Sequence, residues 1–342
     1  MQRMWGRWLG VCILFIVIFT GCQGAPATHP SVVVYTAVDQ PYAEPIFAVF
    51  EQNTGIQVKA VYDVEAAKTT GLVNRLIAEK DQPQADVFWN NEIIQTIRLQ
   101  AGGVLQPYQS PNARQIPAAY RDIQGNWTGM TARARVLIIN TNLVTNPDAI
   151  DSLQDLLDES YPGRLVGIAY PLFGTTATHA AALYQVSGAE EGREFFQSLV
   201  DRGVQVVDGN AVVRDLVASG ALAFGLTDTD DACGALNRGD PVAIQFPDQH
   251  SQGVLLLPST VAMLAGSPHP LQAQALVDFL LLPETEQLLL DAGFSAIPLH
   301  PGLQPIDPCI DSGSIQAMPV DYVQLSQSFE IVMSELREIF IR

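Results

Sequence analysis

Short runs of apolar residues alternate with amphipathic segments over most of the chain. Runs in which nearly every position is apolar are typical of strands buried on both faces of a sheet, whereas apolar residues three and four positions apart predict helices. In the first part of the chain the predicted strands span residues 31–36, 56–62 and 86–89, and the predicted helices span residues 41–53, 69–79 and 92–101. Buried strands joined by helices form parallel βαβ units, so this part is predicted to be an α/β lobe.

A long strand pattern over residues 127–140 leads into a second set of alternating elements. This set contains predicted strands at 165–169, 205–207, 222–226 and 242–246 and predicted helices at 150–157, 176–186, 190–201 and 211–218. The apolar run 253–264 then resembles a return crossing, and we expect the helices that follow, 270–292 and 322–341, to pack back onto the first lobe. Two α/β lobes joined by two strand crossings predict a hinged clamshell that binds its ligand in the cleft. The predicted boundaries are residues 31–134 with about 258–342 for the first lobe and residues 135–257 for the second.

The first residues predict export. Arg3 and Arg7 precede an apolar run, residues 9–19, which is too short to span a bilayer but has the length of a signal-peptide core. The run closes on small residues and Cys22, a pattern typical of a lipoprotein signal. A signal cleaved without lipidation is the alternative, and both predict a periplasmic or cell-surface protein. The lipoprotein interpretation assigns residues 1–21 to the signal peptide and residues 22–30 to a lipidated tether that anchors the protein to a membrane.

Charge and cysteine content narrow the range of partners. The formal net charge of -18 becomes -20 once Arg3 and Arg7 leave with the signal, because no acidic residue precedes Cys22. Such a charge repels nucleic acid, so nucleic-acid binding is not expected. Cys233 and Cys309 are then the cysteines left in the folded part, and they either form a disulfide or stay as buried thiols.

The most informative local pattern is an apolar run that ends in three carboxylates, Asp228, Asp230 and Asp231. In open α/β sheets ligands bind beyond the carboxyl ends of strands, so this cluster is predicted to lie at a ligand site. Capping of the next helix is the alternative interpretation, although a single Asp suffices for a cap.

Other acidic side chains at predicted strand ends add oxygen ligands. Hard cations prefer oxygen donors, and carboxylates also supply compensating charge. Binding the ammonium of an organic solute, or forming salt bridges that close the lobes, are the alternatives. The predicted metal ligands are Asp39, Glu92, Asp228 and Asp230, and Glu65 and Asp231 are further candidates for ligand contact.

A second group of residues favours an anion. Gly174, Thr175 and Thr176 follow a predicted strand and open a helix, where backbone N–H groups and hydroxyls can cradle an anion. Arg133 and Arg135, two apart on a strand, point to one face of the sheet and can bind an oxyanion bidentately. An ordinary helix start and a structural ion pair are the alternatives.

Five segments resemble a known family in their order and spacing. They are Val-Val-Val-Tyr-Thr-Ala at 32–37, Phe-Glu-Gln-Asn-Thr-Gly-Ile at 50–56, Ala-Asp-Val-Phe-Trp at 85–89, Ala-Arg-Ala-Arg-Val-Leu at 132–137 and Gly-Arg-Leu at 163–165. From Val32 to about Pro298 the chain resembles the extracellular solute-binding proteins of ABC importers, in the ferric-iron-binding, type II branch. The resemblance implies a two-lobed α/β clamshell with parallel or mixed sheets, helices on both faces and two hinge crossings. It also implies that the protein delivers a solute to ABC permease membrane subunits, and the clamshell itself is expected to function as a monomer.

The resemblance further implies that Fe(III) is bound together with a synergistic anion, as the transported ligand and not as a catalytic cofactor. Members of the branch ligate iron through an acceptor after the first strand, a Glu after the Asp-Val-Phe strand and a Tyr pair in the second lobe. This chain offers Asp39 at the first place, Asn90, Asn91 and Glu92 at the second, and Asp228 to Asp231 at the third. A binder of a phosphonate, a phosphate ester or another small organic solute is the alternative. An exported hydrolase is a weaker one, because the chain shows no catalytic motif.

Overall fold

The computed structural model describes residues 30–62, 70–294, 296–305, 307–310 and 315–341. The predicted signal peptide, Cys22 and Glu65 lie outside these residues, as does almost all of the predicted tether. Within the described part, no helix combines the length and the apolar character needed to cross a membrane.

The described strands form one mixed, 11-stranded sheet in the order β2-β1-β3-β10-β5-β8-β6-β7, with β4, β9 and β11 paired beside this path. β5 belongs to both halves of the molecule, because it pairs with β10 up to Ala134 and with β8 from Arg135 onwards. The strands are β1 Ser31–Thr36, β2 Gln57–Tyr62, β3 Val87–Asn90, β4 Leu105–Gln106, β5 Thr128–Asn140, β6 Val166–Ala169, β7 Gln205–Val207, β8 Phe224–Asp228, β9 Val242–Gln245, β10 Leu256–Leu264 and β11 Ile297–Pro298.

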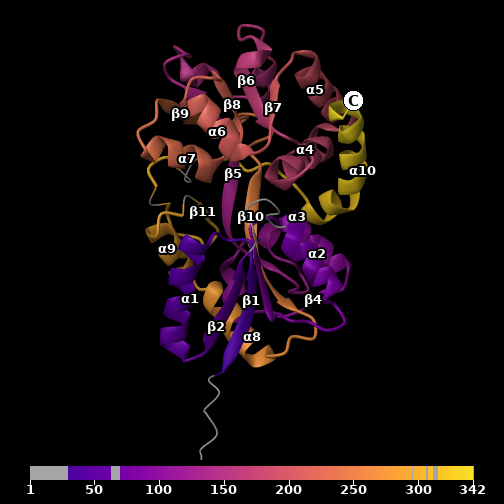
Figure 1. The fold of residues 1–342 in the computed structure, drawn as a ribbon, viewed down its shortest axis with the longest axis vertical. Helices are drawn as coiled ribbons and strands as arrows, with labels where there is room; N and C mark the ends of the chain where they lie inside the picture. Colours follow the sequence, from indigo (N-terminus) through magenta and orange to yellow (C-terminus); the bar gives the residue numbers. More distant parts are fainter. Residues whose placement is uncertain (1–29, 63–69, 295, 306, 311–314, 342) are drawn as a thin grey trace, which may run out of the picture.

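Helices cover the sheet in two lobes, which Figure 1 shows one above the other with β5 and β10 running between them. We call the half around β1, β2, β3 and β10 lobe 1, and the half around β6, β7, β8 and β9 lobe 2. The helices are α1 Gln40–Thr54, α2 Thr70–Ala78, α3 Ile93–Ala101, α4 Gly174–Ser187, α5 Ala189–Asp201, α6 Asn210–Ala218, α7 Thr229–Asn237, α8 Pro270–Leu280, α9 Pro283–Asp291 and α10 Tyr322–Phe340.

The first strand shows how the apolar runs build the core. Val32 and Val34 of β1 pack with Phe47 and Phe50 of α1 on one side of the sheet, while Tyr35 packs into a different cluster on the other side. Successive strand residues point to opposite faces, so a strand covered on both faces needs apolar residues at nearly every position. The predicted strand over 31–36 is confirmed with the same bounds.

Two predicted helices differ from the structure. The helix predicted over 270–292 is two helices, α8 and α9, because Pro283 cannot continue a helix from its amino side and instead begins the second one. The helix predicted over 150–157 is a pair of 3-10 turns, Pro147–Ala149 and Leu153–Leu157, the second of which begins with a capping box at Ser152.

The terminal helix α10 corrects a further expectation. It packs against α3 of lobe 1 but also against α4 and α5 of lobe 2, and Figure 1 shows it along the side of lobe 2. Val332 and Leu336 lie in the same apolar cluster as Tyr184 of α4, and Arg193 of α5 lies 3.7 Å from Glu335. The helix therefore contacts both lobes, whereas the expectation was that it would pack back onto lobe 1.

Candidate functional site

A cleft of about 980 Å³ opens between the two lobes. It lies at the carboxyl ends of β1, β3, β6, β7 and β8, where each strand passes into the amino end of a helix. This is the edge at which parallel sheets bind ligands. Eight of the residues predicted for ligand binding line the cleft: Asp39, Glu92, Arg133, Gly174, Thr175, Asp228, Asp230 and Asp231.

Asp228 is the last residue of β8 and is 1% exposed. Its two carboxylate oxygens accept hydrogen bonds from Arg135 at 2.5 Å, Thr175 at 2.8 Å, Asn210 at 3.1 Å and Arg133 at 3.2 Å. Burial alone would raise the pKa of Asp228, but the charges of Arg135 and Arg133 and the hydrogen bonds from Arg135 and Thr175 outweigh burial and lower it. Asp228 is therefore an ionised, fully paired carboxylate.

Each of the other two carboxylates of the cluster also has a guanidinium partner. Arg133 lies 3.3 Å from Asp230, and Arg214 lies 3.0 Å from Asp231. Burial nevertheless raises the pKa of Asp230, and burial with the charges of Asp230 and Asp228 raises the pKa of Asp231 to about 7. The carboxylates of Asp230 and Asp231 thus lie where additional positive charge would be favourable.

The chain itself occupies part of the predicted anion cradle, namely the two arginines and the Thr175 hydroxyl. Arg133 and Arg135 do reach the same point, as their spacing predicts, and Thr175 lies beside them. The anion at that point is the carboxylate of Asp228, whereas a bound anion was expected. Thr176 is buried next to Arg135 and lines a small apolar cavity, not the cleft.

Two predicted ligands after β3 are placed differently from the prediction. Both carboxylate oxygens of Glu92 are engaged, because they accept from the backbone N–H groups of Ile94 and Gln95 and from the hydroxyl of Thr178. Glu92 therefore caps α3 and joins it to α4 of lobe 2. Asn90 is fully buried, donates to the backbone of Glu92, and does not line the cleft.

Several polar residues of the cleft were not among the residues predicted for ligand binding. They include Tyr42, Asn210 and Arg214. Tyr42 lines the cleft together with Asp39 and Asp230, and burial, followed by the charges of Asp230 and Asp39, raises the pKa of its phenol. The position of Tyr42 in the first turn of α1, just after the end of β1, was the signal that could have identified it.

The amino ends of α1, α4, α6 and α7 all reach the cleft without a side-chain cap. Uncapped helix amino ends carry partial positive charge and free N–H groups, so they attract anionic groups. The cleft therefore combines a carboxylate cluster with features that favour an anion.

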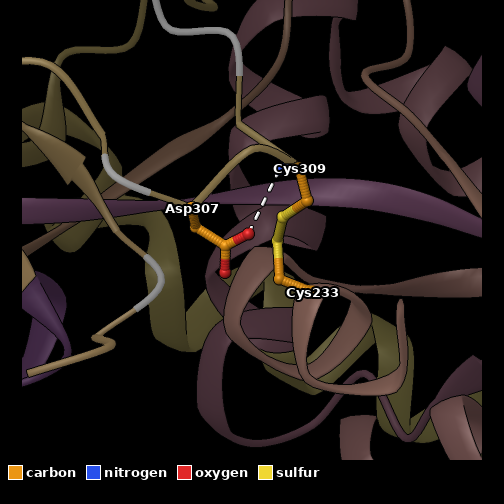
Figure 2. A group of neighbouring side chains, drawn as sticks. All are labelled: Cys233, Asp307 and Cys309. Atoms are coloured by element: carbon orange, nitrogen blue, oxygen red, sulfur yellow. Dashed lines mark hydrogen bonds between the residues drawn. A yellow bond between two sulfur atoms is a disulfide. The ribbon is translucent and has the colours of Figure 1, made fainter. Parts of the chain in front are cut away.

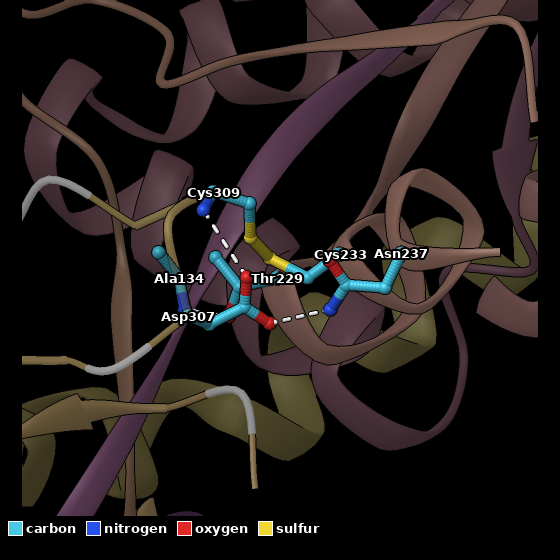
Figure 3. Close-up of a disulfide and its surroundings, with 6 residues drawn as sticks. All are labelled: Ala134, Thr229, Cys233, Asn237, Asp307 and Cys309. Carbon is cyan, nitrogen blue, oxygen red and sulfur yellow. Dashed lines mark hydrogen bonds between the residues drawn. A yellow bond between two sulfur atoms is a disulfide. The ribbon is translucent and has the colours of Figure 1, made fainter. Parts of the chain in front are cut away.

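A disulfide fixes the helix that carries Asp230 and Asp231. Cys233 of α7 is bonded to Cys309, with the Cα atoms 5.8 Å apart, which settles the alternative left open by the sequence. Figure 2 shows the carboxylate of Asp307 beside this bond, where it accepts from the backbone N–H of Cys309 at 3.1 Å. Figure 3 shows a second link, in which Asn237 of α7 donates to Asp307 at 2.9 Å. The segment at 307–309 thus holds α7 at two points.

Replacing Asp231 by Asn is predicted to flatten the pH dependence of stability. The folded chain binds the proton of Asp231 more tightly than the unfolded chain, because its pKa rises from 3.8 to about 7 on folding. This carboxyl therefore makes the free energy of unfolding fall as the pH rises from about 4 to about 7. Relative to the wild type, Asp231→Asn should gain stability across this window, which urea unfolding at several pH values measures. If the free energies of unfolding of the two proteins change in parallel with pH, the raised pKa of Asp231 is contradicted.

Comparison with known proteins identifies the family. Residues 46–316 match the family described as bacterial extracellular solute-binding protein. The iron uptake protein A1 of Synechocystis sp. is 24% identical over 270 residues, 75% of this chain and 73% of that protein. The structure of Trichodesmium IdiA (FutA) in complex with iron and citrate ligands superposes with a TM-score of 0.80 at 20% identity, over 91% of this chain and 100% of that one. AfuA of Actinobacillus pleuropneumoniae, with exogenous fructose-6-phosphate bound, gives a TM-score of 0.77 at 20% identity, over 90% and 98%. The predicted two-lobed α/β clamshell is confirmed, and the chain belongs to the bacterial extracellular solute-binding proteins.

Proposed function

We propose that the protein binds a ferric ion together with a small anion in the cleft and presents it to the membrane subunits of an ABC importer. The observation that carries this proposal is the carboxylate cluster: oxygens of Asp228, Asp230 and Asp231 lie within 4.8 Å of one another at the cleft wall. Oxygen donors with negative charge are what a hard cation prefers. Several relatives are named as iron-binding or iron uptake proteins, which agrees with this choice.

The donors would come from both lobes. Asp230 and Asp231 line the lobe 2 side of the cleft, and Asp39 and Tyr42 line the lobe 1 side. The raised pKa values of Tyr42, Asp230 and Asp231 share burial as their leading cause, and in each case neighbouring carboxylates add to it. A bound cation would relieve this repulsion and favour the ionised forms of all three groups. Tyr42 would then supply one phenolate, in the absence of the expected Tyr pair.

The arginines and the helix ends account for the anion. In this structure Arg133 contacts the cleft carboxylates of Asp228 and Asp230, and Arg214 contacts that of Asp231. If a metal ion takes over those carboxylate oxygens, the guanidinium groups become available to an anion that accompanies the metal. The uncapped amino ends of α4 and α6 add N–H donors on the same side.

The double variant Asp230→Asn/Asp231→Asn is expected to weaken iron binding about 100-fold, or by about 3 kcal/mol, since it removes two of the three carboxylates of the cluster. Affinity for ferric citrate measured by equilibrium dialysis checks this. Asp215→Asn is the matched control, because Asp215 also contacts Arg214 but is 61% exposed and lies outside the cleft lining. Equal affinities for the double variant and the wild type would contradict binding of iron by the carboxylates of Asp230 and Asp231.

A phosphate ester or phosphonate is the second candidate solute. The uncapped ends of α4 and α6 beside Arg214 favour it, because such a group of donors suits a phosphate. It ranks second because Asp228 already occupies the Arg135–Thr175 cradle.

The cellular setting of this function rests on the first residues of the chain. The Cys22 pattern supports lipidation and attachment to a membrane, with residues 22–30 as the tether. Capture without conversion of the solute, a monomeric state and handover to permease subunits are the corresponding expectations for a protein of this family.

A further inference from the structure

The carboxylate of Asp228 lies among donors that also bind one another. Arg135 donates to Thr175 at 3.2 Å and to Asn210 at 3.0 Å, and Asn210 donates to Thr175 at 2.8 Å. We call these three residues, together with Arg133, the Asp228 seat. Two guanidinium groups, one hydroxyl and one amide form a donor set that suits a carboxylate or a phosphate.

Helix capping does not explain why Asp228 lies there. Asp228 occupies the N-cap position of α7, yet its side chain makes no capping hydrogen bond. Its carboxylate accepts hydrogen bonds instead from Arg133, Arg135, Thr175 and Asn210. The side chain therefore does not cap α7, and its hydrogen-bond donors belong to β5, α4 and α6.

The charge balance explains what holds it in place. Arg135 is fully buried and the side chain of Arg133 is 13% exposed, so two positive charges lie in or next to the interior. Uncompensated buried charges are strongly unfavourable. Asp228 contacts both arginines, and Asp230 is a second partner of Arg133, at 3.3 Å. Without Asp228, the seat would present two guanidinium groups and two neutral donors to any small anion that could enter from the cleft.

We propose that the Asp228 seat is an oxyanion-binding site that the protein fills with its own carboxylate, so that the solute is recognised without placing an anionic group there. The solute would then be selected through its cationic part, which faces Asp230, Asp231 and Asp39. Selection of the solute through its cationic part rests on the proposed function, whereas the filling of the seat by Asp228 does not depend on it.

Anion rescue of Asp228→Ala tests the seat in the full chain. Thermal unfolding is followed in sodium formate, inorganic phosphate or sodium chloride at equal ionic strength, so that general screening is the same in each. In chloride the variant should unfold roughly 10 °C below the wild type, because two arginines lose their anion. Formate should raise its Tm saturably by roughly 5 °C, since an anion bound only by the folded state stabilises it.

Two controls separate the seat from general anion effects. The Tm of the wild type should be no higher in formate than in chloride, because Asp228 already occupies its seat. Asp228→Asn should have a lower Tm than the wild type. Formate should not raise that Tm, because the amide has the same shape as the carboxylate and leaves no room for an added anion.

Three results would overturn the proposal: Asp228→Ala that is equally stable in formate and chloride, a wild type that gains as much as the variant, or a variant that stays unfolded even in formate. Formate rescue of the variant combined with no iron binding by the wild type would contradict only the proposed function.

Discussion

Replacing Arg135 by Met lowers the free energy of unfolding by about 3–5 kcal/mol, the cost of breaking a buried ion pair by removing one partner. Arg135 has no exposed side-chain surface and lies 2.5 Å from Asp228, which is itself 1% exposed. Methionine fills much of the same volume, so the loss reports chiefly on the buried carboxylate of Asp228 losing one of its two guanidinium partners. Urea unfolding with linear extrapolation measures the change.

A double variant, Arg135→Met/Asp228→Leu, shows whether charge is the cause. Removing both partners leaves no unpaired carboxylate, so this variant should be more stable than Arg135→Met alone. A loss below about 1 kcal/mol in Arg135→Met would mean that the pair is solvated and not buried as described.

The second large effect concerns the disulfide, whose removal in Cys233→Ala/Cys309→Ala should lower the free energy of unfolding by about 4 kcal/mol. The bond closes a loop with a sequence separation of 76, and a cross-link of that span removes much of the entropy of the unfolded chain. The loss is large against the total stability that a folded domain usually has. Chemical denaturation of the wild type and the variant measures it.

Reduction serves as the control for the disulfide prediction. Dithiothreitol should destabilise the wild type to a similar extent and leave the double alanine variant unchanged. Wild-type protein that unfolds at the same denaturant concentration with and without reductant would contradict a stabilising bond between Cys233 and Cys309.

Local patterns predicted the elements well where the deciding interactions are local. The apolar run at 31–36 is a strand because both faces are covered, and Glu92 begins a helix because its carboxylate can cap the next turn. The split at Pro283 also follows from a local rule, the missing N–H of proline, and could have been read from the sequence.

Partners in the site depend on register between distant strands, which local patterns do not contain. Arg135 meets Asp228 because β5 and β8 pair antiparallel with these two residues directly opposite each other. The sequence showed two arginines suited to an anion and three aspartates suited to a cation. It did not show that the arginines would bind one of these aspartates, Asp228. For the same reason, the pairing of Cys233 with Cys309 and the packing of α10 against both lobes were not predictable from spacing.

The most direct test of the central claim is the iron content of the purified protein after loading with ferric citrate and desalting, measured by atomic absorption. The account predicts about one iron per wild-type molecule, as expected for a single cleft site, and little in Asp230→Asn/Asp231→Asn. Wild-type protein that retains no iron, or a double variant that retains as much as the wild type, would contradict capture of iron by the carboxylates of the cleft.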